Sequence, residues 1–318
     1  MKHFSLNENG TFRICQLTDI HLEHDRLHEE REQTCALIKN AIRDTNPDLI
    51  VITGDLAWGP HDDLEIDRLA SIMEELGVAW APVLGNHDGQ DLADGGETGR
   101  EMFAGFLANR KGGLFELGPK DVAGHGNYTI TVGGTPDAPK WVLYLLDSRE
   151  SGFDFSQVLW YKKTSEAFGN DHSELAFFHI PIPEYDWVWD YGDCLGYNQE
   201  QVAAMPLNVG MFSAMVRRGR MRGTFVGHDH VNDFEGTLRG IRLCYGRGSG
   251  YQCYGMNGFE HGARIIDLKP DGTFDTQIYT ESGAHYHQQR EHPHKIGSKC
   301  GQPRIPPKKN QRHGSLLR

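Results

Sequence analysis

The stretch AWAPVLGNHDG, residues 79–89, decides how the rest of the sequence is interpreted. Its apolar first half has the character of a β-strand and leads through a glycine into Asn86, His87 and Asp88, which carry an amide, an imidazole and a carboxylate. Taken alone, the motif is ambiguous, because Asn, His and Asp are common in turns. It becomes informative because several other apolar runs in this chain end in the same way.

The first ninety residues alternate between short apolar runs and longer amphipathic segments. We predict, in order, a strand at 12–18, a helix at 28–44, a strand at 49–53, a helix at 62–76 and a strand at 79–84. Strands separated by helices in this way predict parallel, right-handed βαβ units. The run LIVIT at 49–53 is apolar throughout, which is typical of a strand buried on both faces.

The remainder of the chain is less regular. We predict helices at 100–108, 156–168 and 208–218, and strands at 128–132, 141–146, 174–178, 223–226, 240–245 and 263–268. Residues 181–206, rich in Pro, Trp, Tyr and Asp, are expected to form a long irregular loop. We expect one domain over residues 1–284. Residues 285–318 are basic and lack apolar periodicity, which predicts a flexible C-terminal tail.

The composition is that of an ordinary soluble globular protein, with 318 residues, 38% hydrophobic residues and a net charge of −12. This acidic balance argues against nucleic acid as a partner. No apolar run reaches the roughly 18 residues of a membrane span, so no membrane partner is expected. The start has no apolar signal core and the six cysteines lack metal-type spacing, so we expect a cytoplasmic protein. The oligomeric state is not indicated.

Five of the predicted strands end in side chains that bind metal ions. They are, in chain order, Asp19 with His21, Asp55, Asn86 with His87, His179, and His228 with His230. Each alone has an ordinary explanation as a turn, a helix cap or a core histidine. Because the carboxyl ends of parallel strands meet at one edge of an α/β sheet, we expect all five ends to converge. Carboxylate, imidazole and amide donors without thiolate favour Fe, Mn, Zn or Ni and argue against a structural zinc site.

These motifs resemble those of the calcineurin-like metallophosphoesterases. The matching blocks are Asp19-Ile-His21, Gly54-Asp55, Gly85-Asn-His-Asp88, His179 and Gly227-His-Asp-His230. Further blocks at 127–130, 143–148, 178–183, 227–234 and 245–251 resemble the purple-acid-phosphatase-like branch. The likeness covers about residues 12–280. It implies an α/β fold, a four-layer α/β/β/α sandwich of two mixed sheets, around two metal ions of Fe, Mn, Zn or a similar element.

The resemblance also implies roles for individual residues. One metal would be held by Asp19, His21 and His230, the other by Asn86, His179 and His228, and Asp55 would bridge them. His87 is expected to stabilise the transition state or protonate the leaving oxygen, with Asp88 orienting its ring. True purple acid phosphatases have a metal-binding tyrosine three residues after the bridging aspartate. Trp58 stands there in this chain, so we expect no purple colour.

The expected activity is hydrolysis of phosphomonoesters by direct attack of a metal-bridging hydroxide. A phosphodiesterase acting on small diesters is the alternative, because the same metal core serves both reactions. A non-catalytic metal-binding scaffold is disfavoured by the complete set of ligands. Tyr185, Trp187 and Arg247 are candidate substrate contacts, although packing and surface roles are equally open. The acidic 185–194 segment favours a small phosphorylated substrate over a long nucleic acid.

Overall fold

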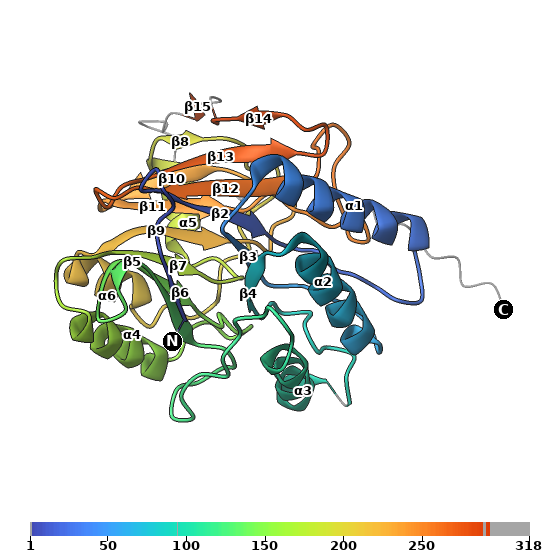
Figure 1. Ribbon diagram of the computed structural model, residues 1–318, viewed down its shortest axis with the longest axis horizontal. Helices are drawn as coiled ribbons and strands as arrows, with labels where there is room; N and C mark the ends of the chain where they lie inside the picture. The colour runs from blue at the N-terminus through green and yellow to red at the C-terminus, as the bar shows by residue number, and fades with distance from the viewer. Residues whose placement is uncertain (1, 94, 289–290, 293–318) are drawn as a thin grey trace.

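The computed structural model describes residues 2–93, 95–288 and 291–292 and consists of two mixed β-sheets with helices on their outer faces (Figure 1). The smaller sheet contains, in spatial order, β14 (His285–Tyr286), β13 (Phe274–Thr280), β12 (Gly262–Leu268), β2 (Phe12–Leu17), β3 (Leu49–Thr53) and β4 (Ala79–Val83). The larger sheet contains β1 (Lys2–Phe4), β5 (Tyr128–Thr135), β6 (Ala138–Leu145), β7 (Ser173–Phe177), β9 (Met221–Val226), β11 (Ile241–Tyr245), β10 (Glu235–Leu238), β8 (Cys194–Leu195) and β15 (Glu291–His292).

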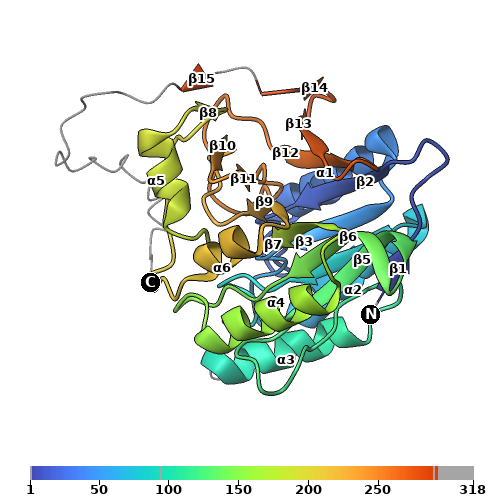
Figure 2. The ribbon, with the colours of Figure 1, turned by 90° about the vertical axis from the view of Figure 1, so that its left-hand side faces the viewer.

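The predicted βαβ units form the N-terminal part of the smaller sheet. Strands β2, β3 and β4 are parallel neighbours, connected by α1 (His28–Thr45) and α2 (Asp62–Leu76), and α3 (Gly96–Ala108) follows β4. Every residue of β3 is buried, as its apolar sequence predicts. Helices α2 and α3 lie together on the right of Figure 1 and therefore on the far side of the molecule in Figure 2.

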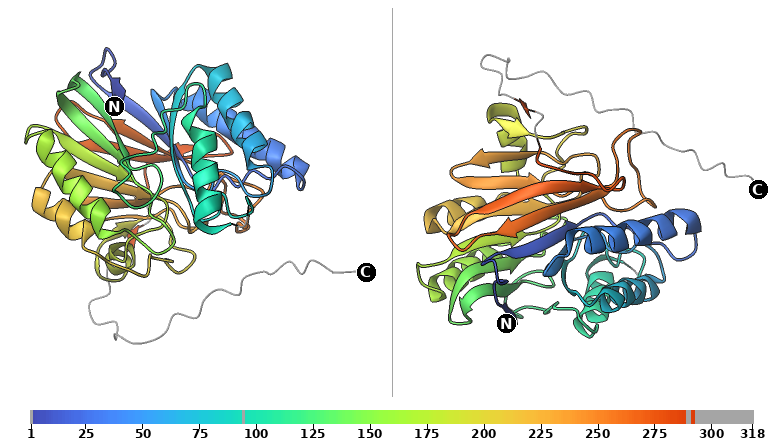
Figure 3. Two further views of the ribbon diagram at one scale, coloured as in Figure 1. Left: turned by 90° about the horizontal axis from the view of Figure 1, so that it is seen from below. Right: turned by 45° about the horizontal axis from the view of Figure 1, so that its top comes forward.

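The larger sheet separates two apolar cores because its side chains alternate between its faces. Along β6, Leu143 and Leu145 belong to the core shared with the smaller sheet, whereas Val142 and Tyr144 belong to the core shared with the helices on the other side. Those helices are α4 (Phe155–Ala167), α5 (Glu184–Tyr191) and α6 (Met211–Arg218). The two helical layers lie on opposite outer sides of the sheets (Figure 3, left). The predicted four-layer sandwich is confirmed.

Several local predictions are corrected. The segment 181–206 is not irregular throughout, because it contains α5 and β8, and its buried residues Tyr185 and Val188 have helical spacing. Strands β1, β10 and β13 were not predicted. Residues 285–288 and 291–292, assigned to the tail from the sequence, extend both sheets as β14 and β15, and the amide of buried Gln288 donates to Asp233 Oδ1 over 2.9 Å. The rest of that tail, residues 289–290 and 293–318, lies outside the described residues. Within the described part of the chain, no helix is long and apolar enough to cross a membrane.

Candidate metal centre

The five predicted strand ends converge at one place, and they come from both sheets. The residues Asp19, Asp55 and Asn86 follow β2, β3 and β4 of the smaller sheet within three positions. His179 and His228 each follow a strand of the larger sheet, β7 and β9, by two positions. The site therefore lies where the carboxyl ends of two sheets meet, rather than at the edge of a single one.

One half of the cluster is built around the carboxylate of Asp55. His179 Nε2 lies 3.2 Å from Asp55 Oδ2 and 2.9 Å from Asn86 Oδ1, and the ring of His228 lies 5.1 Å from that of His179 between centroids. Asp55 and His179 are fully buried. With Asp19, they form a group of carboxylate and imidazole donors close enough to hold a metal ion.

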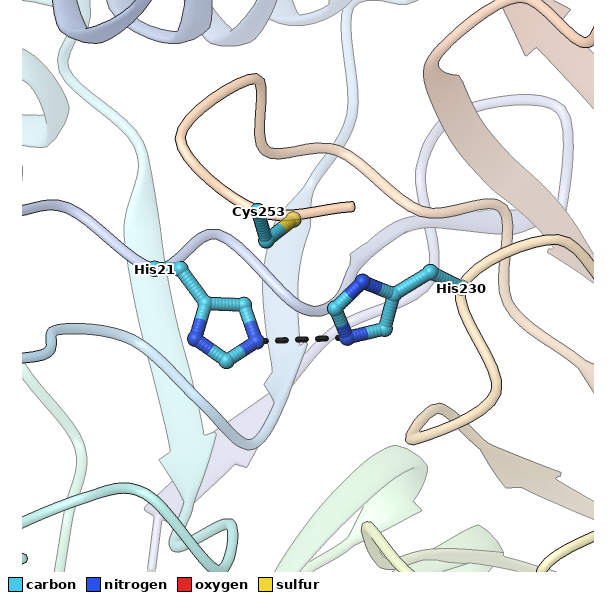
Figure 4. Close-up of side chains that lie close together, drawn as sticks. All are labelled: His21, His230 and Cys253. Carbon is cyan, nitrogen blue, oxygen red and sulfur yellow. Dashed lines mark hydrogen bonds between the residues drawn. The ribbon is translucent and has the colours of Figure 1, made fainter. Parts of the chain in front are cut away.

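The other half is built around two imidazoles that face each other. His21 Nε2 lies 3.3 Å from His230 Nε2 (Figure 4). It also lies 3.3 Å from Asp55 Oδ2, and His230 Nε2 lies 3.6 Å from Asp19 Oδ1. Asp55 thus contacts both halves, which is the position expected of a bridging ligand. The structure brings the seven predicted ligand residues into one cluster.

The backbone around these residues is unusual in a way that places their side chains. Asp19, His21, Asp55 and His228 have φ values of 53°, 47°, 52° and 78°, in the left-handed region that side chains other than glycine rarely adopt. Such strained residues gather at functional sites, where the surrounding structure holds them in place. The glycine before Asn86 is required as well, because a Cβ on Gly85 would overlap the carboxylate of Asp55.

Hydrogen bonds to carbonyl groups fix which nitrogen of two imidazoles faces the cluster. His179 Nδ1 lies 2.8 Å from the carbonyl oxygen of Thr53, and His230 Nδ1 lies 3.1 Å from that of Tyr254. A carbonyl only accepts, so each Nδ1 carries a proton, and each Nε2 is the nitrogen that faces the cluster and can bind a cation once it carries no proton. This arrangement is the usual support of a metal-binding histidine. The donor set therefore fits a metal ion.

Burial and charge set the protonation of the cluster. Burial lowers the pKa of His21 well below its usual value, and burial together with the nearby His179 lowers the pKa of His228 to about 3. Both rings are neutral at pH 7, which is the form that binds metals. Burial also acts to lower the pKa of His179, but the carboxylates of Asp55 and Asp19 outweigh it and raise that pKa to about 9. A bound cation would replace the proton of the His179 ring as the positive charge beside Asp55 and Asp19.

The structure corrects the role expected of Asp88. Its carboxylate is fully buried and accepts backbone N–H groups of Asp55, Leu56 and Gly85 over 3.0, 2.7 and 2.7 Å, instead of orienting His87. The ring of His87 is bonded through Nδ1 to Gln90 Oε1 over 2.7 Å. Gln90 was not among the predicted site residues, although it lies three positions after His87 in the same turn.

Two of the three predicted substrate contacts are buried and bonded within the fold. Tyr185 is fully buried, and its hydroxyl donates to the Thr224 carbonyl over 2.9 Å. Arg247 is buried and pairs with Asp233 over 2.5 Å. Trp187 lies on the outside of α5 and is 49% exposed. Tyr185 and Arg247 therefore stabilise the fold, which corrects their assignment to substrate binding.

Two features near the cluster were not anticipated. A cavity of about 440 Å³ lies beside Asn86, and its lining includes Gln90, Arg100 and Arg149. The thiol of Cys253 lies close to the facing imidazoles of the cluster. Arg149 follows the end of β6, as the metal ligands follow their strands, and this is a weak sequence signal for the cavity. No sequence signal indicates the position of the Cys253 thiol.

The sequence comparisons place the chain in a family. Residues 12–232 match the family model described as calcineurin-like phosphoesterase, and the chain belongs to this family. Its relatives include two proteins of Arabidopsis thaliana named "Probable inactive purple acid phosphatase 29" and "Probable inactive purple acid phosphatase 14". They are 33% and 28% identical, over 81% and 86% of this chain and 77% and 79% of theirs. The chain is thus a purple-acid-phosphatase-like member of the family.

Solved structures agree with the fold. A dimetal phosphatase of Danio rerio superposes with a TM-score of 0.57 at 13% identity, over 88% of this chain and 97% of that protein. At this level of identity the likeness shows that the two chains share a fold.

Proposed function

We propose that this protein hydrolyses small phosphomonoesters at a centre of two divalent cations. The observation that carries the proposal is the convergence of seven oxygen and nitrogen donors, with Asp55 Oδ2 3.3 Å from His21 Nε2 and 3.2 Å from His179 Nε2. The cations, when bound, would polarise the phosphoryl oxygens and acidify a water molecule. Asp19, His21 and His230 would hold one of them, Asn86, His179 and His228 the other, and Asp55 both. We propose that the two metals are Fe, Mn or Zn.

His87 is proposed to protonate the leaving oxygen. Its ring lies beside the cluster, with its centroid 5.1 Å from that of His21 and 4.7 Å from that of Trp58, and it is half-buried. The backbone N–H of His87 donates to Asp55 Oδ1 over 2.8 Å, which ties the ring's position to the cluster. Because Gln90 accepts from Nδ1, Nε2 is left to exchange the proton with the substrate.

The cavity beside Asn86 is proposed to bind the part of the substrate that leaves. Arg100 and Arg149 line it, and the guanidinium of Arg100 is engaged by Asp147 over 2.7 Å and by the carbonyl of Gly85. Arg149 is the cation available to a substrate oxygen. Glu97 and Glu150 in the same lining would repel a polyanion, so a small monoester is favoured over nucleic acid. A small phosphodiester is the alternative substrate.

A non-catalytic metal-binding scaffold is a second candidate function. It is favoured by one observation, namely that the two Arabidopsis relatives are named as inactive phosphatases. A scaffold would keep the metal ligands, because cations bound to them would stabilise the fold. The proposed enzyme needs His87 as well, and that residue is present and lies at the cluster.

One experiment separates these functions. The purified protein is analysed for bound metals, and turnover of p-nitrophenyl phosphate is compared with that of bis-p-nitrophenyl phosphate before and after chelation. We expect two metal equivalents, preferred hydrolysis of the monoester, and activity that is lost on chelation and restored by added metal. Preferred turnover of the diester would make the protein a phosphodiesterase. Bound metal without turnover of either ester would favour the scaffold.

We also propose that the protein works in the reducing cytoplasm. The five described cysteines are free, which supports this location. Fractionation of the source cells with an antibody to the protein would test it.

A further inference from the structure

Three donors from distant parts of the chain meet at one side of the candidate centre. They are His21, which follows β2, His230, which follows β9, and Cys253, which lies between β11 and β12. Their ligand atoms all lie within 4.8 Å of one another. Figure 4 shows the Cys253 side chain over the gap between the two imidazole rings. No sequence motif indicates a thiol at this place.

The position of Cys253 is built into the fold. The N–H groups of Ser249 and Gly250 donate to the carbonyls of Thr18 and Asp19 over 2.9 and 3.1 Å, which holds the segment against the end of β2. A Cβ on Gly250 would overlap the carbonyl of Ile20, so the approach depends on glycine. The chain then turns back, and Cys253 Sγ donates to the Gly250 carbonyl over 3.2 Å.

The placement of the two imidazoles also fits a shared cation. The Nε2 atoms of His21 and His230 are 3.3 Å apart, and the bond from His230 Nδ1 to the Tyr254 carbonyl leaves its Nε2 as the nitrogen that can bind a cation. Two imidazole nitrogens bound at about 2.05 Å to one ion of four or five ligands, at angles of about 90–120°, are roughly 2.9–3.6 Å apart, a range that includes the observed 3.3 Å. A thiolate on the same ion, at about 2.3 Å, would lie roughly 3.1–3.8 Å from each nitrogen, and the ligand atoms of the three residues already lie within 4.8 Å of one another.

We propose that Cys253 is a thiolate ligand of the cation held by His21 and His230, and that this half of the centre is therefore selective for a thiophilic divalent ion such as Zn²⁺. The other half, around His179 and Asn86, offers only oxygen and nitrogen and suits Mn²⁺ or Fe²⁺ equally well. On ligation the S–H bond breaks, its proton passes to solvent and the sulfur electron pair binds the cation, with no change of oxidation state. The inference rests on the proposed two-cation centre and specifies its metals.

Cobalt is the probe that tests this ligand. The metal-free full-length protein is titrated with Co²⁺, and absorption is recorded for the wild type, Cys253→Ser and the control Cys300→Ser. We expect a sulfur-to-cobalt charge-transfer band in the near ultraviolet for the wild type and the control, and its loss in Cys253→Ser. Serine can still donate to the Gly250 carbonyl, so this variant is expected to fold. Zn²⁺ affinity measured by competition with a chelator should fall about 10-fold or more in the same variant.

The outcomes separate this inference from the proposed function. Co²⁺ binding by the wild type with d–d bands but no charge-transfer band would overturn Cys253 as a ligand and leave the metal centre in place. A charge-transfer band that persists in Cys253→Ser would also overturn it. No Co²⁺ binding by the wild type would overturn both the ligand and the centre. An absent charge-transfer band in the wild type overturns the ligand even if the variant does not fold, and Cys253→Ala then replaces Cys253→Ser as the test of a band that is present.

Discussion

Replacement of Asp88 by asparagine is the sharpest test of how the fold holds the candidate centre. The Asp88 carboxylate accepts N–H groups through both oxygens: Oδ2 from Asp55 and Gly85, and Oδ1 from Leu56 and Ala57. In Asp88→Asn, one oxygen becomes an NH₂ group that donates and cannot accept. Whichever orientation the amide takes, two of these buried N–H groups lose their acceptor.

The expected loss of stability follows from those two groups. A buried N–H left without an acceptor costs about 1–3 kcal/mol, so Asp88→Asn should lower the free energy of unfolding by about 2–6 kcal/mol. An unfolding entropy of about 2.1 cal/mol/K per residue over the 318 residues makes each kcal/mol worth about 1.5 °C, and the apparent Tm should fall by about 3–9 °C. Metal affinity should fall too, because the loop that carries Asp55 is loosened.

The assay is thermal unfolding followed by circular dichroism at a fixed scan rate, with and without added metal. Asp91→Asn is the matched control, because Asp91 is an exposed carboxylate in the same loop, and its effect should stay within about 0.5 kcal/mol. An unchanged Tm in Asp88→Asn, with a shifted pH profile of kcat, would refute this reasoning. It would return Asp88 to the role of orienting His87.

Three further predictions concern individual side chains. His87→Ala should lower kcat by about 10²–10⁴ while metal content stays normal, and Gln90→Ala should lower it less; an unchanged kcat in His87→Ala would remove the general acid from the proposal. Burial, more than the acidic neighbours, raises the pKa of Asp62 to about 8, above its value in the unfolded chain. Between about pH 4 and pH 8 the native state therefore binds a proton that the unfolded state has lost, and the free energy of unfolding falls as the pH rises. The Tm advantage of Asp62→Asn over the wild type should therefore grow from pH 5 to pH 8, and a gap independent of pH would contradict this. Arg247→Ala, which leaves Asp233 buried and unpaired, should cost about 3–5 kcal/mol in unfolding experiments with KM unchanged, whereas a raised KM at normal stability would restore Arg247 to substrate binding.

The fold and the ligand positions were accessible from the sequence because both depend on local patterns. An apolar run such as 49–53 identifies a buried strand, and a strand followed closely by a metal-binding residue fixes where that residue lies in an α/β fold. The helix α5 was missed although Tyr185 and Val188 have helical spacing, because a segment rich in Pro and Asp resembles a loop. A short strand such as β10 depends on its neighbours, and composition alone does not reveal it.

Roles that depend on contacts across the chain were not accessible in this way. Asp88 is adjacent to His87, which suggested that the two interact, but the side chain turns to the backbone of the loop after β3, more than thirty residues earlier in the sequence. Arg247 appeared free between its flanking glycines because nothing local indicates its ion pair with Asp233. The position of Cys253 depends on the hydrogen bonds of its segment to the end of β2, over two hundred residues away.

His87 distinguishes an enzyme from a scaffold more sharply than the metal ligands do. Asp19 and Asp55 are each 1% exposed, so two carboxylates lie together out of water, and bound cations would stabilise the fold whether or not the protein is catalytic. Both an enzyme and a non-catalytic scaffold are therefore expected to retain metal. The side chain of His87 is half-buried and is hydrogen-bonded to Gln90, which is itself exposed, so the fold depends on it far less. A large loss of turnover in His87→Ala, with metal content and Tm unchanged, would therefore be explained by catalysis and not by a structural role.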